Sequence, residues 1–304
     1  MKHLLTLAAF AALAAAAVAT EITVRPNKPW KAAGNGEYTI NFDGGKTWPS
    51  IDLKSQEIKP DKFYRLSFEA KASGAANTQT GITGMRGGKR STDYTPWRAG
   101  ADYVPFNLYF CTNALENPRI FFNINPGPAG DVAVRNLKLD EVANLGDNLL
   151  PNGDFENGND FTPYSAKYEK TMSVVPSPSF FSGTKSLKLT KSANEGAEVI
   201  SIAWLPAVPG KTIVVKFWAK SENGTIPGYM YLDFGRGGHK KHLYKPYNFN
   251  IEPEWKEIVL EYAVPTDTDT WTALKDGLCR LHIGLSKTAE AGAAFIDGVE
   301  YSIK

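Results

Sequence analysis

The chain has 304 residues, of which 42% are hydrophobic and 22% charged, and its formal net charge is +2. A charge this close to neutral argues against a nucleic acid partner, and the length is sufficient for two domains that each bury a core. The two cysteines, Cys111 and Cys279, are too few for a disulfide scaffold or a cysteine metal site. We expect two buried free thiols, with an inter-domain disulfide as the alternative.

The start of the chain has the pattern of a secretory signal peptide. A short basic segment (residues 1–3) precedes an apolar, alanine-rich run (residues 4–18), and Ala17-Val18-Ala19 fits the small-residue cleavage pattern. We expect cleavage after Ala19 rather than a membrane anchor, because the run is short for a span and no basic stop signal follows it. No later stretch is apolar for long enough to cross a bilayer. These features predict a secreted or periplasmic protein, which we expect to be a monomer.

The sequence after Thr20 alternates between short strands and turns. Apolar and polar residues alternate clearly over residues 64–71 and again over residues 213–220, and a proline turn introduces each segment, at Pro60 and Pro209. Gly, Pro, Asn and Asp separate the other short strands, and no helical period of any length follows the signal peptide. This pattern predicts an all-β fold built from β-sandwiches.

Several motifs of the first half recur in the second half in the same order. Arg86-Gly87-Gly88 recurs as Arg236-Gly237-Gly238, and equal spacing then leads to residues 94–97 and 244–247. Further pairs of segments are 64–71 with 213–220, 103–110 with 255–262, 119–122 with 280–283, and 134–137 with 296–299. Matches in one order with a nearly constant offset indicate an internal duplication.

We therefore divide the chain into a signal peptide and two tandem domains. The predicted segments are a signal peptide (1–19), a divergent β-sandwich domain (20–142), a linker (143–147) and a second β-sandwich domain (148–304). The short linker predicts that the two domains are close neighbours.

The opening of the second domain carries a family resemblance. Residues Asn148–Glu156 place the turn Pro151-Asn152-Gly153 between apolar anchors, and we expect Gly153 to supply a positive φ there. This run and residues 295–299 resemble the first and last strands of carbohydrate-binding modules of families four, nine and twenty-two. The resemblance implies galactose-binding-like jelly rolls, and the weaker first copy extends it to a tandem. The expected fold is thus all-β, with two tandem jelly-roll β-sandwich domains after a signal peptide.

The resemblance also implies a structural calcium ion in the second domain. The residues at the matching positions are Gly153, Ser182 and Lys185 through their carbonyls, and Glu156 and Asp297 through their carboxylates. Carboxylate and carbonyl oxygens are suitable ligands for Ca²⁺. The first domain lacks the opening motif and has Arg135 at the position of Asp297, so we expect no calcium there.

Aromatic residues in the second domain are candidates for sugar binding. If Met230 faces the core, alternation places Tyr229, Tyr231 and Asp233 together on the opposite face, and Trp218 also points outward from its strand. Aromatic planes pack on the C–H faces of sugar rings, while polar side chains bind the hydroxyls. The alternative is that a loop or the neighbouring domain covers these rings. The candidate ligand-binding residues are Trp218, Tyr229, Tyr231, Asp233, Arg236, Tyr244 and Tyr247.

The repeated motif is open to two interpretations. Arg236, Tyr244 and Tyr247 recur in the first copy, so they form either a shared structural turn or a binding loop. In the other positions the first copy lacks the candidates: Glu69 stands in place of Trp218, and Gly81 in place of Tyr231. We therefore expect the second domain to be the one that binds.

The sequence contains no recognisable catalytic motif. His239 and His242 lie in a polar loop, and His282 alternates with apolar neighbours, which points it away from the core. Acids such as Glu69, Asp233 and Glu257 are present, but sequence spacing alone neither pairs two of them across a cleft nor excludes such a pair. We expect non-catalytic binding of a polysaccharide or oligosaccharide by aromatic stacking and hydrogen bonding. The alternatives are a structural or adhesion protein with a protein or cell-envelope partner, and a small glycan-active hydrolase.

Overall fold

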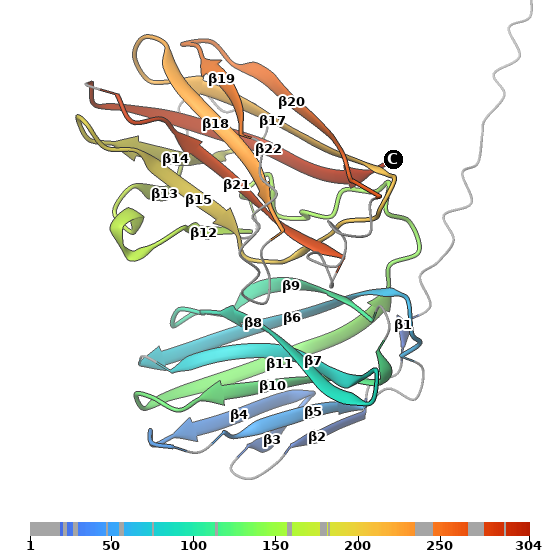
Figure 1. Cartoon of the computed structure of the whole chain (residues 1–304). Coiled ribbons are helices and arrows are strands. Elements are labelled where there is room, and N and C mark those ends of the chain that lie inside the picture. Colours follow the sequence, from blue (N-terminus) through green and yellow to red (C-terminus); the bar gives the residue numbers. More distant parts are fainter. Residues whose placement is uncertain are drawn as a thin grey trace, which may run out of the picture.

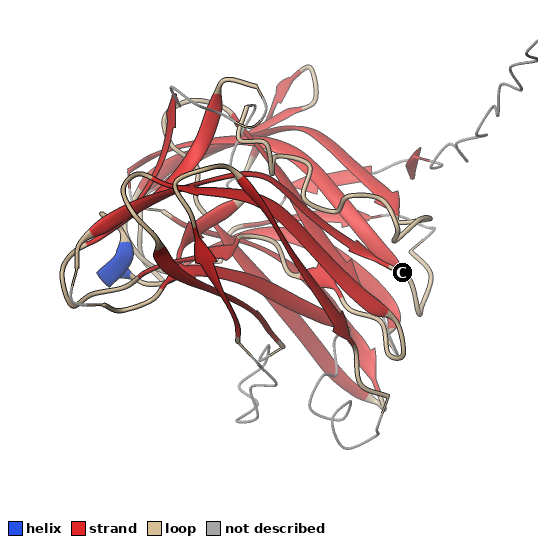
Figure 2. Ribbon diagram, turned by 90° about the horizontal axis from the view of Figure 1, so that it is seen from above, coloured by secondary structure: helices blue, strands red, loops and turns tan. Residues whose placement is uncertain are grey.

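The computed structural model describes residues 19–20, 23–26, 30–46, 48–54, 58–74, 76–112, 115–156, 160–176, 181, 183–234, 246–266, 277–288 and 290–304. Over these residues the chain is all β, and its only helix is the short 3₁₀ helix η1 (Ala166–Tyr168). The strands form two β-sandwiches, one above the other in Figure 1, and the view from above in Figure 2 shows strands throughout. The predicted class of two tandem jelly-roll domains is confirmed.

The first domain consists of two antiparallel sheets. One sheet has the order β3 (Lys31–Gly34), β4 (Glu37–Phe42), β11 (Gly130–Glu141), β6 (Phe63–Gly74), β9 (Val104–Cys111), and β1 (Ala19–Thr20) pairs with β11. The other has the order β2 (Thr23–Pro26), β5 (Ser50–Lys54), β10 (Glu116–Asn125), β7 (Asn77–Arg86), β8 (Lys89–Trp97).

The second domain also consists of two antiparallel sheets. One, named here the site sheet, has the order β12 (Phe161–Pro163), β15 (Ala197–Ser201), β21 (Leu278–Leu285), β18 (Ile226–Asp233), β19 (Tyr247–Ile251), and β16 (Leu205–Pro206) pairs with β21. The other has the order β13 (Met172–Pro176), β14 (Lys185–Lys191), β22 (Gly292–Ile303), β17 (Thr212–Ser221), β20 (Lys256–Ala263).

The two domains share their strand order and an irregularity in their last strand. The order β4-β11-β6-β9 corresponds to β14-β22-β17-β20, and β5-β10-β7-β8 corresponds to β15-β21-β18-β19. The last strand of each domain shifts register after Arg135 or Asp297, where Asn136 and Gly298 have φ angles of 55° and 59°. Unrelated proteins of one fold can share a strand order, so the duplication and the domain boundaries stay predictions.

The alternation of the two longest predicted strands is confirmed. In β6 the residues Tyr64, Leu66, Phe68 and Ala70 are buried, and in β17 the buried series is Ile213, Val215, Phe217 and Ala219. Hydrophobic burial of one face of each strand against the opposite sheet forms the core of each sandwich. Residues 94–97 belong to the repeated motif expected to form a turn or a binding loop, but they form the end of β8. Trp97 is buried there and donates a hydrogen bond from Nε1 to Thr80 Oγ1 (2.9 Å).

Both cysteines are buried free thiols, as the sequence indicated. Burial raises the pKa of the Cys279 thiol to about 12, and the thiol is 3.2 Å from the Tyr301 hydroxyl. A thiol with this pKa stays protonated at neutral pH, so it is a poor nucleophile.

The opening turn of the second domain is tied to β22. Leu149 donates a backbone hydrogen bond to the Tyr301 carbonyl (2.8 Å), and Val299 donates one to the Gly153 carbonyl (2.9 Å). The expectation of a positive φ at Gly153 is wrong: Phe155 has the positive φ in this turn, at 60°. Gly153 is needed for close approach instead, because a Cβ there would overlap the Val299 carbonyl oxygen.

This close approach predicts a specific destabilisation. The variant Gly153→Ala should lower the free energy of unfolding by roughly 2–3 kcal/mol, because the added methyl forces β22 and the turn apart. Gly100→Ala is the matched control, since a Cβ at Gly100 meets no atom within 4 Å. Denaturant unfolding of both variants checks the prediction, and equal stability of the two would contradict it.

Candidate functional site

The outer face of the site sheet holds a row of half-buried polar aromatic residues. In β18, Met230 and Leu232 are buried in the core, while Tyr229, Tyr231 and Asp233 lie on the opposite face. The predicted orientation of β18 is therefore confirmed. Register places Tyr231 beside His282 of β21, Tyr229 beside Gly284, and Asp233 beside Arg280.

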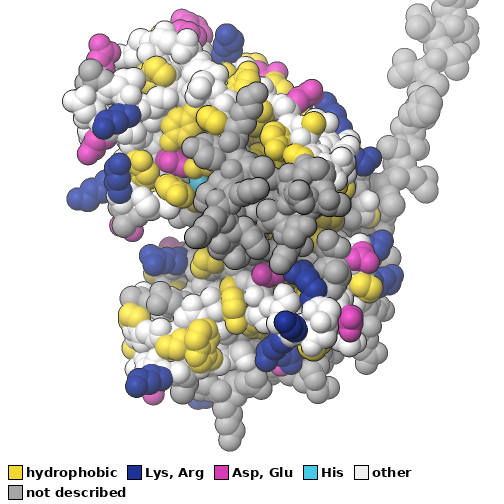
Figure 3. Space-filling model, in the orientation of Figure 1, with side chains coloured by type: hydrophobic (Ala, Val, Ile, Leu, Met, Phe, Trp, Pro, Cys, Tyr) yellow, Lys and Arg dark blue, Asp and Glu magenta, His cyan; other side chains and the backbone are white. Residues whose placement is uncertain are grey.

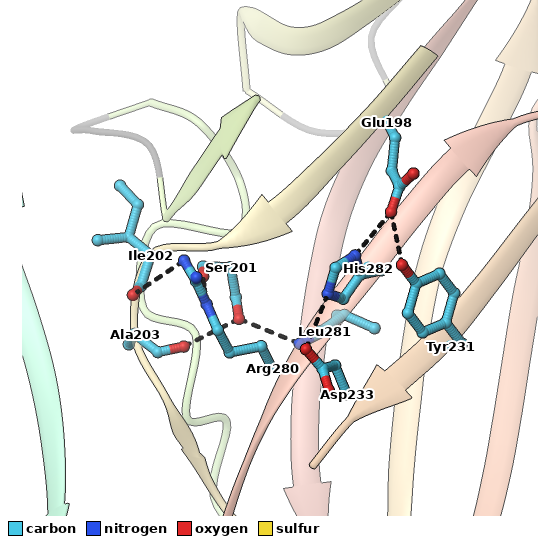
Figure 4. A network of polar contacts seen from close by, with 9 residues as sticks. All are labelled: Glu198, Ser201, Ile202, Ala203, Tyr231, Asp233, Arg280, Leu281 and His282. Atoms are coloured by element: carbon cyan, nitrogen blue, oxygen red, sulfur yellow. Dashed lines mark hydrogen bonds and ion pairs between the residues drawn. The ribbon is translucent and has the colours of Figure 1, made fainter. Parts of the chain in front are cut away.

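A buried carboxylate connects these strands. Glu198 of β15 is only 6% exposed, and it pairs in register with Gly284 of β21. The Tyr231 hydroxyl and His282 Nδ1 both donate to Glu198 Oε1 at 2.7 Å, as Figure 4 shows, and the Tyr229 hydroxyl donates to Oε2 at 3.0 Å. Each donor comes from a strand other than β15, so the carboxylate joins three strands through side chains.

The electrostatics of this cluster keep Glu198 ionised. Burial acts to raise the pKa of Glu198, but the hydrogen bonds from His282, Tyr231 and Tyr229 outweigh burial and lower the pKa. Burial and the adjacent carboxylate raise the pKa of both tyrosine hydroxyls well above the ordinary value. At neutral pH the cluster is therefore one carboxylate that accepts hydrogen bonds from two protonated phenols and an imidazole.

The rings around Glu198 form a stack that ends in an exposed tyrosine. Tyr231 lies parallel to His282 with centroids 4.2 Å apart, and Tyr229 lies parallel to Tyr231 at 6.2 Å. Tyr229 covers Gly284, where any Cβ would overlap its ring. Tyr164, which is 51% exposed, contacts His282 edge-on at 5.2 Å. This arrangement presents aromatic surface to solvent on a backing that hydrogen bonds hold in place.

Two charged side chains that pair in register, Arg280 of β21 and Asp233 of β18, border the stack. Arg280 donates from Nε to the Ser201 carbonyl at 2.7 Å and lies over the ring of Trp204. The carboxylate of Asp233 is 3.9 Å from His282 Nε2 (Figure 4). Both side chains are half-buried and belong to the outer face of the site sheet, beside the rings.

The structure separates the predicted ligand-binding residues. Trp218 lies on β17 in the opposite sheet of the sandwich, where its ring stacks on Phe181 with centroids 3.9 Å apart. Tyr247 pairs in register with the core-facing Met230, so it belongs to the other side of the site sheet, at its exposed edge. Only Tyr229, Tyr231 and Asp233 share one face. Arg236 and Tyr244, together with His239 and His242, lie outside the described residues.

Alternation could not anticipate this separation. It shows that Trp218 and Tyr231 both point out of the core, but a sandwich has two outer faces. Pairing between strands decides which face each residue occupies, and that pairing is a long-range property.

The residues expected to bind calcium accept hydrogen bonds from N–H and O–H groups. Glu156 accepts from the Thr184 amide (2.6 Å) and hydroxyl (2.9 Å) and from the Lys185 amide (2.7 Å), and the amide bonds hold its pKa below the ordinary value. Buried Asp297 accepts from the Phe181 amide at 3.1 Å.

The same segment contains a further obstacle to a bound ion. The Gly153 carbonyl accepts from Val299, and the Lys185 ammonium donates to the Glu156 carbonyl at 2.7 Å. The oxygens suit calcium by type, but a bound ion would have to displace these donors. Ser182 lies outside the described residues, and no group of three or more His, Cys, Asp or Glu elsewhere in the described chain could hold a metal ion.

The acids considered for catalysis lie on different faces. Glu69 accepts a 2.7 Å hydrogen bond from Arg135 in the first domain, Asp233 belongs to the site sheet, and Glu257 lies on β20 of the opposite sheet. These three carboxylates therefore do not face one another across one groove.

Sequence reasoning missed the residue at the centre of the cluster. Glu198 is a charged residue inside a strand whose residues are otherwise apolar or small, from Ala197 to Ser201, and a buried ionised group requires partners. That signal could have identified it. Tyr164 precedes η1 in an irregular segment and has no periodicity that would mark it.

Comparison with family models matches residues 147–274 to the family described as Carbohydrate binding domain (CBM 4/9). The second domain matches this family of carbohydrate-binding domains. The resemblance inferred from the sequence is therefore confirmed for the part of the chain that contains Glu198, Tyr229, Tyr231 and Tyr164. Comparison with curated proteins found no match.

Three solved structures illustrate what the chain is similar to. The tandem CBM22-1-CBM22-2 domain of Paenibacillus barcinonensis Xyn10C is 14% identical with a TM-score of 0.40, and the match covers 97% of this chain and 100% of that one. The family 11 module of Clostridium thermocellum in complex with a β-1,3-1,4-mixed-linked tetrasaccharide is 15% identical (TM-score 0.35; 49% and 92% covered). TmCBM61 in complex with β-1,4-galactotriose is 16% identical (TM-score 0.36; 52% and 97% covered).

The carboxylate cluster predicts a pH-dependent contribution to stability. Because folding lowers the pKa of Glu198, its contribution is complete at neutral pH and is lost as pH falls below the ordinary glutamate value of about 4.3. Glu198→Gln should lower the free energy of unfolding by about 2 kcal/mol at pH 7, because an amide cannot accept from all three donors. Denaturant unfolding from pH 7 to pH 3 should show the difference from wild type shrinking; a constant difference contradicts the assignment.

Proposed function

We propose that the second domain binds a polysaccharide or oligosaccharide on the outer face of the site sheet, without cleaving it. The observation that supports this most directly is the ring stack held by Glu198. Two phenols and an imidazole are each fixed by a hydrogen bond of 3.0 Å or less to one carboxylate, so the platform is ordered before a ligand arrives. Preorganisation of this kind reduces the entropy cost of binding. The family match supports a carbohydrate as the ligand.

The geometry suits a sugar in two respects. The exposed ring of Tyr164 offers a surface on which the C–H face of a pyranose packs. Asp233 and Arg280, at the border of the stack, supply an acceptor and a donor for ring hydroxyls. Binding then depends on stacking for affinity and on the polar border for orientation.

The state of Glu198 supports binding rather than hydrolysis. Glycosidases use one carboxylic acid with a raised pKa as a proton donor and a second carboxylate across the bond. The pKa of Glu198 is lowered and both its oxygens accept hydrogen bonds within the protein. It is therefore suited to hold the platform and not to protonate a glycosidic oxygen.

We also propose that the protein acts outside the cytoplasm after loss of residues 1–19. The signal-peptide pattern supports export to the periplasm or the medium. Among the described residues, no helix has the length and hydropathy needed to span a bilayer. Export as a monomer would leave the exposed ring stack accessible to polysaccharide outside the cell.

Binding should depend on Tyr164 and not on Tyr247. Tyr164→Ala should weaken polysaccharide binding by about tenfold, because it removes the exposed stacking surface. Tyr247→Ala is the matched control, since this ring has similar exposure but lies on the core side of the site sheet at its edge. Affinity electrophoresis with xylan, mixed-linkage β-glucan and β-1,4-galactan measures the effect.

The same experiment separates the proposal from its rivals. Unchanged binding in a folded Tyr164→Ala protein would contradict the assigned face. Retention of no polysaccharide by the wild type would favour a protein or cell-envelope partner. Release of reducing sugars by the purified protein would indicate a glycan-active hydrolase.

Calcium binding in the second domain remains part of the proposal, with Glu156 as its central ligand. Calcium should then raise the melting temperature of the wild type by at least about 2 °C, because an ion that binds only the folded state stabilises it. Glu156→Ala should show no such rise. Thermal unfolding in excess calcium and in chelator provides the measurement, and an identical calcium response of the two proteins would remove the claim.

A further inference from the structure

The first domain presents an aromatic surface on the outer face of the sheet β2-β5-β10-β7-β8. Register places Phe121 of β10, Gly81 of β7 and Tyr94 of β8 in one row across this face. The Phe121 ring lies over Gly81, where a Cβ would be only 2.6 Å from the ring, and Tyr94 meets Phe121 edge-on at 5.8 Å. Phe121 is 8% exposed and Tyr94 is 42% exposed. Figure 3 shows hydrophobic side chains gathered on the face of this domain that is turned to the viewer.

A cluster of amide side chains borders the rings. The adjacent row contains Asn123 of β10 and Gln79 of β7, which pair in register and are 5% and 6% exposed. Asn125 donates to Gln79 Oε1 at 2.9 Å. The side-chain oxygens of Asn123 and Asn125 are buried and have no hydrogen-bond partner in the described part of the chain.

Unpaired buried amide oxygens point to a ligand. A buried acceptor without a partner costs about 1–3 kcal/mol, and most such groups in proteins are paired. These oxygens lie on strand positions that alternate with the core residues Ile120, Phe122 and Ile124, so they share the outer face with Phe121. A hydroxyl group laid on that face would satisfy them.

The charged groups on this face include an ion pair and a further cation, Arg90, whose Nε donates to Thr83 Oγ1 at 3.3 Å. Asp52 of β5 pairs in register with Phe121, and its carboxylate lies 3.4 Å from the Arg119 guanidinium. The acid and the base balance each other, so the face presents no net charge from this pair. Trp48, which is 56% exposed, precedes Ser50 by two residues, and Ser50 is the register partner of Asn123. A neutral, hydroxyl-rich molecule with apolar ring faces matches aromatic rings beside amide acceptors.

We propose that the first domain contains a glycan site of its own on this face. Tyr94 and Phe121 pack against a sugar ring, and the side-chain oxygens of Asn123 and Asn125 accept hydrogen bonds from its hydroxyls. This site does not depend on the one assigned to the second domain. A chain with both sites is bivalent toward a polysaccharide, and linkage of the sites raises the apparent affinity for a polymer without any new contact.

The test uses the full chain and removes each site separately. The variants are Tyr94→Ala, Tyr231→Ala and the double variant, with Met85→Ala as the matched control. Met85 is a similarly exposed apolar residue on the same side of β7, four residues beyond Gly81. Binding to xylan, mixed-linkage β-glucan and β-1,4-galactan is measured by affinity electrophoresis, and binding to the corresponding hexasaccharides by calorimetry. Circular dichroism establishes that each variant is folded.

The expected result is a loss specific to Tyr94. Tyr94→Ala should weaken binding to the polymer at least about tenfold through loss of bivalency, and Met85→Ala should bind as wild type does. In the Tyr231→Ala background, residual hexasaccharide binding should disappear when Tyr94→Ala is added. Asn125→Ala, which removes an unpaired acceptor, should also weaken that residual binding.

Each contrary outcome has a distinct meaning. Loss of all binding in Tyr231→Ala alone, with Tyr94→Ala unchanged, overturns the first-domain site and leaves the second-domain assignment intact. Unchanged binding in Tyr231→Ala together with loss in Tyr94→Ala supports the first-domain site and overturns the other. Failure of the wild type to bind any of the three glycans overturns both. If the chain instead binds a protein in a Tyr94-dependent manner and binds no glycan, the glycan site is also overturned.

Discussion

The outer face of the second domain depends on one buried ionised carboxylate. An ion removed from water must be compensated by hydrogen bonds or it destabilises the fold. Glu198 meets this requirement with His282 of the adjacent strand β21 and with the Tyr229 and Tyr231 hydroxyls of β18, the next strand beyond it. The requirement works in both directions, because the donors that neutralise the cost of burial are also held in fixed positions by the carboxylate. Order in the ring stack is thus a consequence of satisfying one charge.

At one corresponding pair of positions on adjacent strands, the two domains carry different pairs of side chains. In β17 and β22 of the second domain, Trp218 pairs in register with buried Asp297. In β6 and β11 of the first domain, the equivalent pair is Glu69 with Arg135, which form an ion pair at 2.7 Å. The aromatic residue and the acid occur together in one domain, and the acid and the base occur together in the other. Side chains that pair in register on adjacent strands contact each other, so the residue type at one position restricts which residue types fit at the other.

Local pattern predicted much of this architecture, and long-range pairing decided the rest. Alternation correctly placed Tyr231 outside the core and Phe217 inside it, because strand geometry determines which face a residue occupies. It could not assign Trp218 to the opposite sheet from Tyr231, since that depends on strand order. Nor could it assemble the Glu198 cluster, whose hydrogen-bond donors lie 31 to 84 residues from Glu198 in the sequence. At Gly153, turn statistics suggested a positive φ, whereas crowding against β22 is the reason for glycine.

The burial of both thiols limits their reaction with oxidants, which matters if the protein is exported as proposed. Exported proteins meet oxidants that join accessible cysteines, and reaction requires a thiolate that an oxidant can reach. Cys279 is fully buried with its pKa raised to about 12, and Cys111 is also enclosed. In the folded protein, both thiols should therefore react slowly in disulfide exchange and in cross-linking between chains. An oxidant can reach the two thiols only before folding buries each cysteine in its sandwich.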